Sequence, residues 1–167
     1  MTLHRPSNVD DEETLRGILE ALSKIAGDLP IIFPIHPRTR KMAEQFGLSR
    51  FFNLDDKVKG IWLTEPLGYL DFLHLNMNAR MVLTDSGGLQ EETTVLGVPC
   101  ITMRNNTERP ITCEVGTNFM VGNDPDKILE CAGRIMKCNL PAGRIPEKWD
   151  GRAAERIIEA ILETAVK

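Results

Sequence analysis

The chain has 167 residues, of which 42% are hydrophobic and 26% are charged, and this composition is typical of one folded domain with its own apolar core. The formal net charge of −4 argues against a nucleic-acid or anionic-membrane partner, because either would require a basic face. No apolar run is long enough to cross a membrane and no signal peptide opens the sequence, so we expect a cytoplasmic protein.

Strand-like and helix-like segments alternate along the chain and are joined by short turns. An amphipathic helix is predicted over residues 11–25, where Leu15, Ile18, Leu19 and Leu22 recur at helical spacing after acidic residues in the first turn. The pattern then predicts strands at 30–35, 58–63, 80–84, 98–103 and 118–121, and helices at 38–46, 69–77, 89–96, 125–136 and 151–165. Residues 141–150 are expected to form an irregular surface crossing before the last helix, which closes the domain.

This alternation predicts an α/β fold with a Rossmann-like, doubly wound parallel sheet and helices on both faces. Thr2, Leu3 and His4 look like the last residues of a first strand whose beginning is missing, so we expect Met1 to mark a fragment or a shortened gene. Ligands of such sheets bind outside the carboxyl ends of the strands, often in a crevice shared with another domain. Half of that crevice is expected to lie outside this chain.

The cysteines and histidines carry no metal-binding pattern. The cysteines lack CxxC spacing and a nearby histidine cluster, and the histidines stand alone; they are Cys100, Cys113, Cys131 and Cys138, and His4, His36 and His74. The cysteines are therefore expected to be reduced thiols, as in a cytoplasmic protein, and we expect neither a metal nor another cofactor.

The most informative stretch is 83–92, where a buried strand ends in a glycine pair that opens a helix. Gly87 and Gly88 lack the β-carbons that would keep a ligand away from the backbone. Unpaired N–H groups and the positive end of the helix dipole favour an anion there. Ser86 either caps the helix or donates its hydroxyl to the ligand. The stretch predicts a phosphate site, although glycine-rich turns after strands are weakly specific.

Polar residues follow each predicted strand, and a parallel sheet brings all these turns to one rim. They are His4 and Arg5, the 36–38 turn, Glu65, the 85–88 turn, and the 104–109 segment. Each has an ordinary alternative role: a loop hydrogen bond for His4, a surface ion pair for Arg38, and an ion pair with Glu108 or Glu114 for Arg109. Their joint position is what favours a basic, hydroxyl-lined pocket.

Two further residues fit a nucleotide at this rim. Glu92 follows Gly88 by one helical turn and is expected to face the same rim, where its carboxylate can accept hydrogen bonds from vicinal hydroxyls such as those of a ribose. Phe72 belongs to a helix that starts beside the rim and could stack on a base. The alternatives are a solvated carboxylate for Glu92 and core packing for Phe72.

Taken together, seven motifs in this order and spacing resemble the C-terminal half of the UDP-N-acetylglucosamine 2-epimerase family. They are TLHRPSNVD at 2–10, HPR at 36–38, EPLGY at 65–69, TDSGGLQEE at 84–92, GVP at 97–99, RNNTERP at 104–110 and GTN at 116–118. The resemblance covers nearly the whole chain. One departure is Ser7, which stands where the family often has Glu in a His-Arg-x-Glu-Asn motif.

The resemblance implies a two-lobed fold of the glycosyltransferase-B type, in which residues 1–167 are the UDP-binding C-terminal lobe and the N-terminal lobe is absent from this chain. The implied reaction interconverts UDP-N-acetylglucosamine and UDP-N-acetylmannosamine by elimination and re-addition of UDP. It implies no cofactor, a homodimeric full-length protein and a part in cell-envelope polysaccharide synthesis. The carboxylates that move protons would belong to the other lobe.

The resemblance also assigns roles to residues of this chain. His4 is the catalytic candidate, which would add charge or hydrogen bonds as UDP leaves. The candidates for binding UDP are Arg5 and Arg109 beside the phosphates, Ser86, Gly87 and Gly88 on the diphosphate, Glu92 on the ribose, and Phe72 with the Leu67 backbone at the uracil. Three other interpretations stay open: a stand-alone UDP-sugar-binding module, the nucleotide lobe of a glycosyltransferase, and a hydrolysing epimerase.

Overall fold

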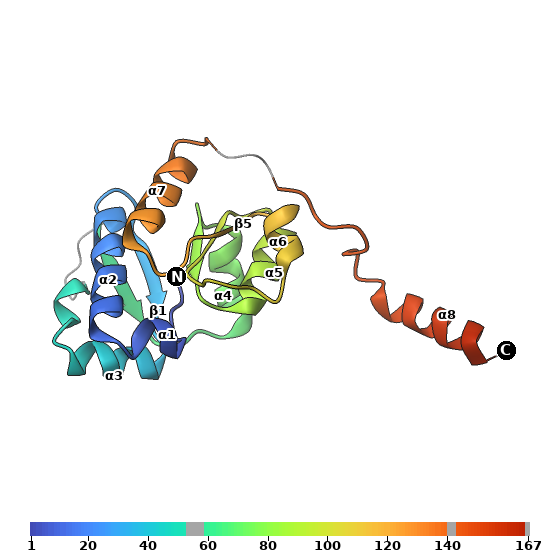
Figure 1. Ribbon diagram of the computed structural model, residues 1–167, viewed down its shortest axis with the longest axis horizontal. Helices are drawn as coiled ribbons and strands as arrows, with labels where there is room; N and C mark the ends of the chain where they lie inside the picture. The colour runs from blue at the N-terminus through green and yellow to red at the C-terminus, as the bar shows by residue number, and fades with distance from the viewer. Residues whose placement is uncertain (53–58, 140–142, 166–167) are drawn as a thin grey trace.

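A computed structural model describes residues 1–52, 59–139 and 143–165 (Figure 1). The strands are β1 (Ile31–Pro34), β2 (Ile61–Thr64), β3 (Val82–Thr84), β4 (Cys100–Thr102) and β5 (Asn118–Met120). The helices are α1 (Pro6–Val9), α2 (Glu12–Ala26), α3 (Pro37–Gln45), α4 (Tyr69–Met77), α5 (Gly87–Leu96), α6 (Pro110–Glu114), α7 (Pro125–Met136) and α8 (Ala153–Ala165), with a 3-10 turn, η1, at Ser49–Phe51.

All strand pairs are parallel, which confirms the predicted α/β class. In one sheet Ile31 of β1 aligns with Ile61 of β2, and in the other Cys100 of β4 aligns with both Val82 of β3 and Asn118 of β5. The predicted strand at 58–63 is β2, which runs one residue further, and Val58 lies outside the described residues.

The N-terminal segment lies between the two sheets. The Thr2 N–H donates to the carbonyl of Leu83 at 2.9 Å, and the Met1 amino group donates to the carbonyl of Ile32 at 2.6 Å. The expected first strand is therefore present in position, but Thr2, Leu3 and His4 do not form a regular ladder. With this segment counted first, the order across the molecule is β2, β1, segment 1–4, β3, β4, β5, the order of a dinucleotide-binding Rossmann sheet.

Helices α2 and α7 pack side by side, as Figure 1 shows. The Asp11 side chain caps α2 by accepting from the Thr14 N–H at 2.9 Å, and Asp124 caps α7 in the same way at Asp126. Apolar residues at helical spacing, such as Leu15, Ile18 and Leu22 of α2, are fully buried. The burial of this amphipathic face stabilises the half of the domain that carries β1 and β2.

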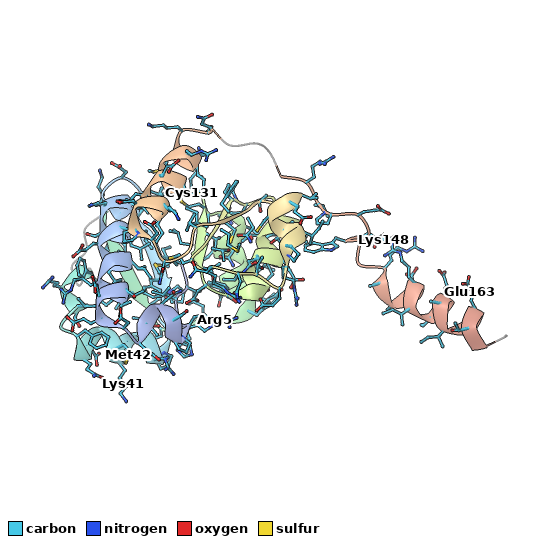
Figure 2. The ribbon with its side chains drawn as sticks, in the orientation of Figure 1. Arg5, Lys41, Met42, Cys131, Lys148 and Glu163 are labelled. Carbon is cyan, nitrogen blue, oxygen red and sulfur yellow. The ribbon has the colours of Figure 1, made fainter. Side chains whose placement is uncertain are left out.

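The last helix differs from the prediction that it closes the domain. Helix α8 has the expected amphipathic sequence, yet it extends away from the folded body (Figures 1 and 2). Ile157, Ile158, Ile161 and Leu162 are each 59% exposed. The prediction of a helix was correct, but within the described chain its apolar stripe stays exposed.

Gly116 lies where the chain passes closest to α5 and α6. A β-carbon there would lie 2.5 Å from Thr94 Oγ1 and 2.6 Å from the carbonyl oxygen of Thr112. We expect Gly116→Ala to lower the free energy of unfolding by about 1–3 kcal/mol through overpacking, measured by urea denaturation. Gly133→Ala in α7 is the matched control, because its β-carbon would meet nothing within 4 Å. Equal stability of the two variants would contradict this description of the packing.

Candidate functional site

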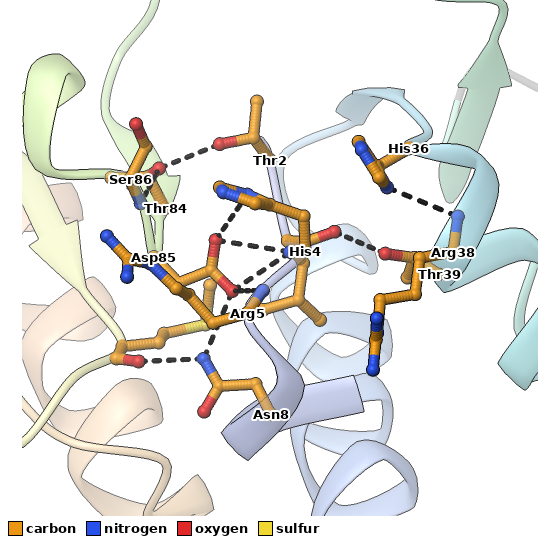
Figure 3. Close-up of polar contacts among 12 residues, drawn as sticks. Thr2, His4, Arg5, Asn8, His36, Arg38, Thr39, Thr84, Asp85 and Ser86 are labelled. Carbon is orange, nitrogen blue, oxygen red and sulfur yellow. Dashed lines mark hydrogen bonds and ion pairs between the residues drawn. The ribbon is translucent and has the colours of Figure 1, made fainter. Parts of the chain in front are cut away.

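The strand order indicates where a ligand binds. In an open parallel sheet, the connections diverge at the point where the strand order reverses, and this leaves a crevice outside the carboxyl ends of the strands. Here that point lies between segment 1–4 and β3. His4, the last residue of segment 1–4, and Asp85, the residue after β3, are in direct contact: His4 Nδ1 lies 2.9 Å from Asp85 Oδ1 (Figure 3).

Helix α5 begins at this crevice with its glycine pair. Gly87 and Gly88 are its first two residues, and the Ser86 side chain makes no capping hydrogen bond, although the Ser86 N–H donates to Thr84 Oγ1 at 2.9 Å. A β-carbon at Gly88 would meet no heavy atom within 4 Å, so there is free space beside the first turn of the helix. The capping alternative for Ser86 is absent, and its hydroxyl is available to a ligand beside exposed helix N–H groups.

A pocket of about 430 Å³ lies next to this helix start. It brings together His4, Leu67, Phe72 and Ser86, four of the residues predicted from the sequence. His36 also lines the pocket, with its ring centroid 5.7 Å from that of His4. The wall is apolar where α4 and the 66–67 turn contribute and polar at the histidines and Ser86, which is the usual make-up of a small-molecule site.

Phe72 packs against the core, as in its predicted alternative role, and it also lines the pocket. It packs partly against the small apolar cluster of Val82, Leu89 and Val98, and its remaining surface lines the pocket. Leu67 is 37% exposed at the pocket edge. A flat ring held from behind by core contacts presents a fixed face, which suits stacking on a planar base.

Asp85 anchors the crevice from within and is fully buried. Burial alone would raise the pKa of its carboxyl group, but hydrogen bonds from the His4 side chain and from the backbone N–H groups of Arg5 and His4 outweigh this effect and hold the pKa below its ordinary value. Asn8 Nδ2 adds a bond to Asp85 at 3.2 Å and another to the carbonyl of Met103 at 2.9 Å. The carboxylate thus ties segment 1–8 to the end of β3.

Arg104, for which the sequence predicted no role of its own, lies beside the first glycine of the pair together with Glu108. Arg104 forms a two-pronged ion pair with Glu108, at 3.0 Å from Nη1 and 2.8 Å from Nη2, and its side chain is only 10% exposed. A β-carbon at Gly87 would lie 3.7 Å from Glu108 and 3.8 Å from Arg104. Hydrogen bonds from Arg104 lower the pKa of Glu108 to about 2, with a smaller contribution from the charge of Arg5.

Arg5 faces the same region from the other side of the crevice. Its backbone N–H donates to Asp85 at 2.7 Å, while its Nε atom is buried and has no hydrogen-bond partner. A buried donor without a partner is costly, so this nitrogen favours the arrival of an acceptor. Arg5 and Arg104 therefore bring two guanidinium groups to the region where α5 starts, and Glu108 balances the charge of Arg104 there.

Arg109 and Glu92 lie outside the pocket described above. Arg109 Nε pairs with Glu91 at 2.8 Å, a different partner from the Glu108 or Glu114 side chains that the sequence suggested, and its Nη1 donates to the carbonyl of Glu108. Glu92 lines a neighbouring hollow between α4 and α5, together with Tyr69 and Trp149. Partial burial there raises the pKa of Glu92. Arg38 pairs with Asp10, as in its predicted alternative role.

A buried polar network holds the 104–109 segment in place. Gln90, which is fully buried, accepts from Thr107 Oγ1 at 2.6 Å and from Asn118 Nδ2 at 3.1 Å. Asn118 also accepts from Thr102 at 2.5 Å. The sequence does not predict this network, because polar residues inside a helix and a strand give no local sign that they face one another. It fixes the segment that carries Arg104.

Other site types receive no support from the described residues. They contain no group of three or more His, Cys, Asp or Glu side chains that could hold a metal ion. The four cysteines are free thiols. Within the described ranges, no helix has the length and apolar character that spanning a bilayer requires.

Known proteins are similar to this chain over most of its length. A family model described as UDP-N-acetylglucosamine 2-epimerase matches residues 1–162. The UDP-N-acetylglucosamine 2-epimerase of Methanocaldococcus jannaschii is 45% identical over 163 residues, which cover 96% of this chain and 43% of that protein. The UDP-2,3-diacetamido-2,3-dideoxy-D-glucuronate 2-epimerase of Pseudomonas aeruginosa is 42% identical over 134 residues, or 78% of this chain and 35% of that protein.

A solved structure gives the same result for the fold. The crystal structure of the M. jannaschii enzyme in complex with UDP-GlcNAc and UDP matches with a TM-score of 0.83 and 43% identity, over 97% of this chain and 44% of that one. The chain thus has the Rossmann-like fold of a glycosyltransferase-B-type enzyme and spans less than half the length of each of these relatives. On the strength of its match over residues 1–162, this chain belongs to the UDP-N-acetylglucosamine 2-epimerase family.

Proposed function

We propose that residues 1–167 are the UDP-binding C-terminal lobe of a non-hydrolysing epimerase that interconverts UDP-N-acetylglucosamine and UDP-N-acetylmannosamine. The observation that carries the proposal is the start of α5, where Gly88 faces open space beside the pocket of His4 and Ser86. An N-terminal lobe would close this crevice and hold the sugar. Elimination of UDP, followed by re-addition on the other face, requires a site that stabilises UDP as it leaves.

The diphosphate would bind at the helix start. The Gly87 and Gly88 N–H groups and the Ser86 hydroxyl would donate to its oxygens, and the dipole of α5 would favour its charge. Arg104 and Arg5 support this position, because the first lies beside Gly87 and the second has a buried Nε without a partner. His4 would meet the same oxygens from the pocket side, where charge develops as the bond to the sugar breaks.

The uridine would extend from the diphosphate along α4 and α5. Phe72 and the Leu67 backbone would flank the uracil, which is supported by their place in the pocket beside Ser86. Glu92 would accept hydrogen bonds from the ribose hydroxyls. Glu92 lines a hollow between α4 and α5 in which its carboxylate is open to such a ligand.

We expect the 167-residue chain to bind UDP more tightly than free N-acetylglucosamine. Every proposed contact is to phosphate, ribose or base, so the free sugar would engage none of them. The affinity for UDP should be weak, because the crevice remains open to water without an opposing lobe. Calorimetric titration with both ligands tests the proposal directly. Equal or tighter binding of the free sugar would refute this assignment.

The ribose and phosphate roles can be separated with two ligands. We expect Glu92→Ala to weaken UDP binding by about 1–3 kcal/mol and to leave inorganic pyrophosphate binding almost unchanged. Arg109→Ala should weaken both ligands, because it removes a positive charge that attracts the phosphates of either one. Glu91→Gln, which removes the carboxylate that pairs with Arg109 and keeps the arginine, is the matched control and should not weaken them. The ribose role of Glu92 would be wrong if its replacement reduced pyrophosphate binding as much as UDP binding.

A second substrate is favoured by a specific observation, the 42% identity to an epimerase named for UDP-2,3-diacetamido-2,3-dideoxy-D-glucuronate. According to their names, this relative and the M. jannaschii epimerase both act on UDP-linked 2-acetamido sugars. This lobe would therefore bind the shared UDP group in either case. Steady-state assays of the two-lobed protein with both sugar nucleotides would decide between them.

The proposal also includes a homodimeric full-length protein, a role in cell-envelope polysaccharide synthesis and a cytoplasmic location. The free thiols support the cytoplasmic location.

A further inference from the structure

The buried carboxylate of Asp85 has one bond that its structural role does not require. Three of its contacts hold backbone or core groups: the N–H groups of His4 and Arg5, at 2.9 and 2.7 Å, and Nδ2 of Asn8, at 3.2 Å. The fourth is to His4 Nδ1, at 2.9 Å. This ring is 37% exposed and lines the pocket beside Ser86 (Figure 3).

The fourth contact fixes the state of the imidazole. An ionised carboxylate accepts hydrogen bonds and cannot donate them, so Nδ1 of His4 must carry a proton. In the neutral ring, Nε2 then has a free lone pair, and in the charged ring it becomes a donor. In either state Nε2 is the nitrogen that remains for a molecule in the pocket, because Asp85 occupies Nδ1.

The neighbouring histidine has the opposite arrangement. His36 Nδ1 accepts the N–H of Arg38 at 3.2 Å, where it caps the start of α3. The neutral ring of His36 must therefore carry its proton on Nε2. Two histidines with centroids 5.7 Å apart are thus expected in opposite tautomers, although the same solvent reaches both.

We propose that Asp85 is a positioning residue: it holds the Nδ1–H of His4, so that Nε2 faces the bound nucleotide and donates to its phosphate oxygens when the ring is charged. The role in binding rests on the proposed function, whereas the tautomer does not. No comparison or motif assigns this role to Asp85, which acts through His4 and does not itself line the pocket. A carboxylate that orients a histidine in this way fixes both the ring rotation and the site of proton exchange.

The tautomer can be measured without a ligand. Long-range ¹H–¹⁵N correlation spectra of the 167-residue chain resolve both ring nitrogens of a histidine, and the sequence has only three histidines to assign. At a pH where the rings are neutral, we expect the Nδ1–H form for His4 and the Nε2–H form for His36. An Nε2–H form, or an even mixture, at His4 would overturn the proposal.

Variants then link the tautomer to binding. Asp85→Asn should convert His4 to a mixture of tautomers and leave His36 unchanged. It should also weaken UDP binding about tenfold, because without the carboxylate the charged ring, whose Nε2–H donates to the diphosphate, is no longer stabilised. Asn8→Ala is the matched control: it removes a different bond to Asp85, so it should lower stability while the His4 tautomer stays the same. Unchanged His4 spectra and UDP affinity in Asp85→Asn would overturn the proposal.

A second pair of variants tests the proposal even if Asp85→Asn fails to fold. The amide nitrogen of Asn approximates Nδ1–H and that of Gln approximates Nε2, so we expect His4→Asn to keep the Asp85 bond and the stability while UDP binding falls about tenfold. His4→Gln should lose the bond and be the less stable of the two. The reverse order of stability would overturn the role of Asp85. If the wild-type chain showed the Nδ1–H form but failed to bind UDP, the proposed function would fail and the tautomer assignment would stand.

Discussion

The 167-residue chain by itself is expected to produce no measurable UDP-N-acetylmannosamine from UDP-N-acetylglucosamine. Epimerisation requires acid and base groups on the sugar side of the cleft, and the loss of such groups costs orders of magnitude in rate even where substrate still binds. Without an opposing lobe, the sugar is also neither positioned nor shielded from water. Prolonged incubation at high chain concentration, with the product separated by chromatography, measures whether any UDP-N-acetylmannosamine forms.

The same assay on a longer chain that supplies an N-terminal lobe should restore turnover. His4→Ala, purified in parallel, controls for contaminating enzyme, because trace activity that persists in this variant does not come from the chain. Turnover by the wild-type chain that disappears in His4→Ala would contradict the assignment of proton transfer to the other lobe. His4 would then be the first candidate for that role.

Gly88→Asp is expected to abolish most UDP binding while the fold becomes slightly more stable. A carboxylate at the second residue of α5 interacts well with the helix dipole, by about 0.3–1 kcal/mol. It would also occupy the open space beside the first turn of the helix and repel a diphosphate, and together with the lost N–H contacts this should weaken UDP about 100-fold or more. Calorimetry gives the affinity and urea denaturation gives the free energy of unfolding.

Two controls isolate the charge at this position. Gly88→Asn has nearly the same shape as Gly88→Asp and should weaken UDP much less, because it adds bulk without repulsion. Gly133→Ala tests helix stabilisation elsewhere, since its β-carbon also faces open space, and it should leave UDP affinity unchanged. Retention of UDP affinity in Gly88→Asp would show that the diphosphate does not bind at the start of α5.

Local patterns predicted most of the secondary structure because the buried faces follow helical or strand periods. The stripe of α2 is a clear example, with Leu15, Ile18 and Leu22 all fully buried. The short helices α1 and α6 were missed, since four or five residues that begin with proline carry no period. The position of α8 could not be predicted either, because an apolar stripe shows that a helix is covered but not by which surface.

The sequence predicted those site residues whose positions follow from the direction of the parallel strands. His4 and Ser86 follow segments that run in parallel, so their approach at the crevice follows from topology. The partners that complete the site were missed: Asp85 for His4, Arg104 for the start of α5, and Gln90 for the 104–109 segment. These contacts join residues that are far apart in sequence or face one another inside the core, and no local spacing records them.

The central claim is that the nucleotide binds at the start of α5, and chemical-shift mapping with UDP tests it most directly. In ¹H–¹⁵N spectra of the 167-residue chain, the backbone amides of Gly87 and Gly88 should shift most, followed by those at Leu67 and Phe72 along the pocket. Amides near Cys138, on another face, should not move. No shift at saturating UDP, or the largest shifts away from Gly87 and Gly88, would contradict the claim.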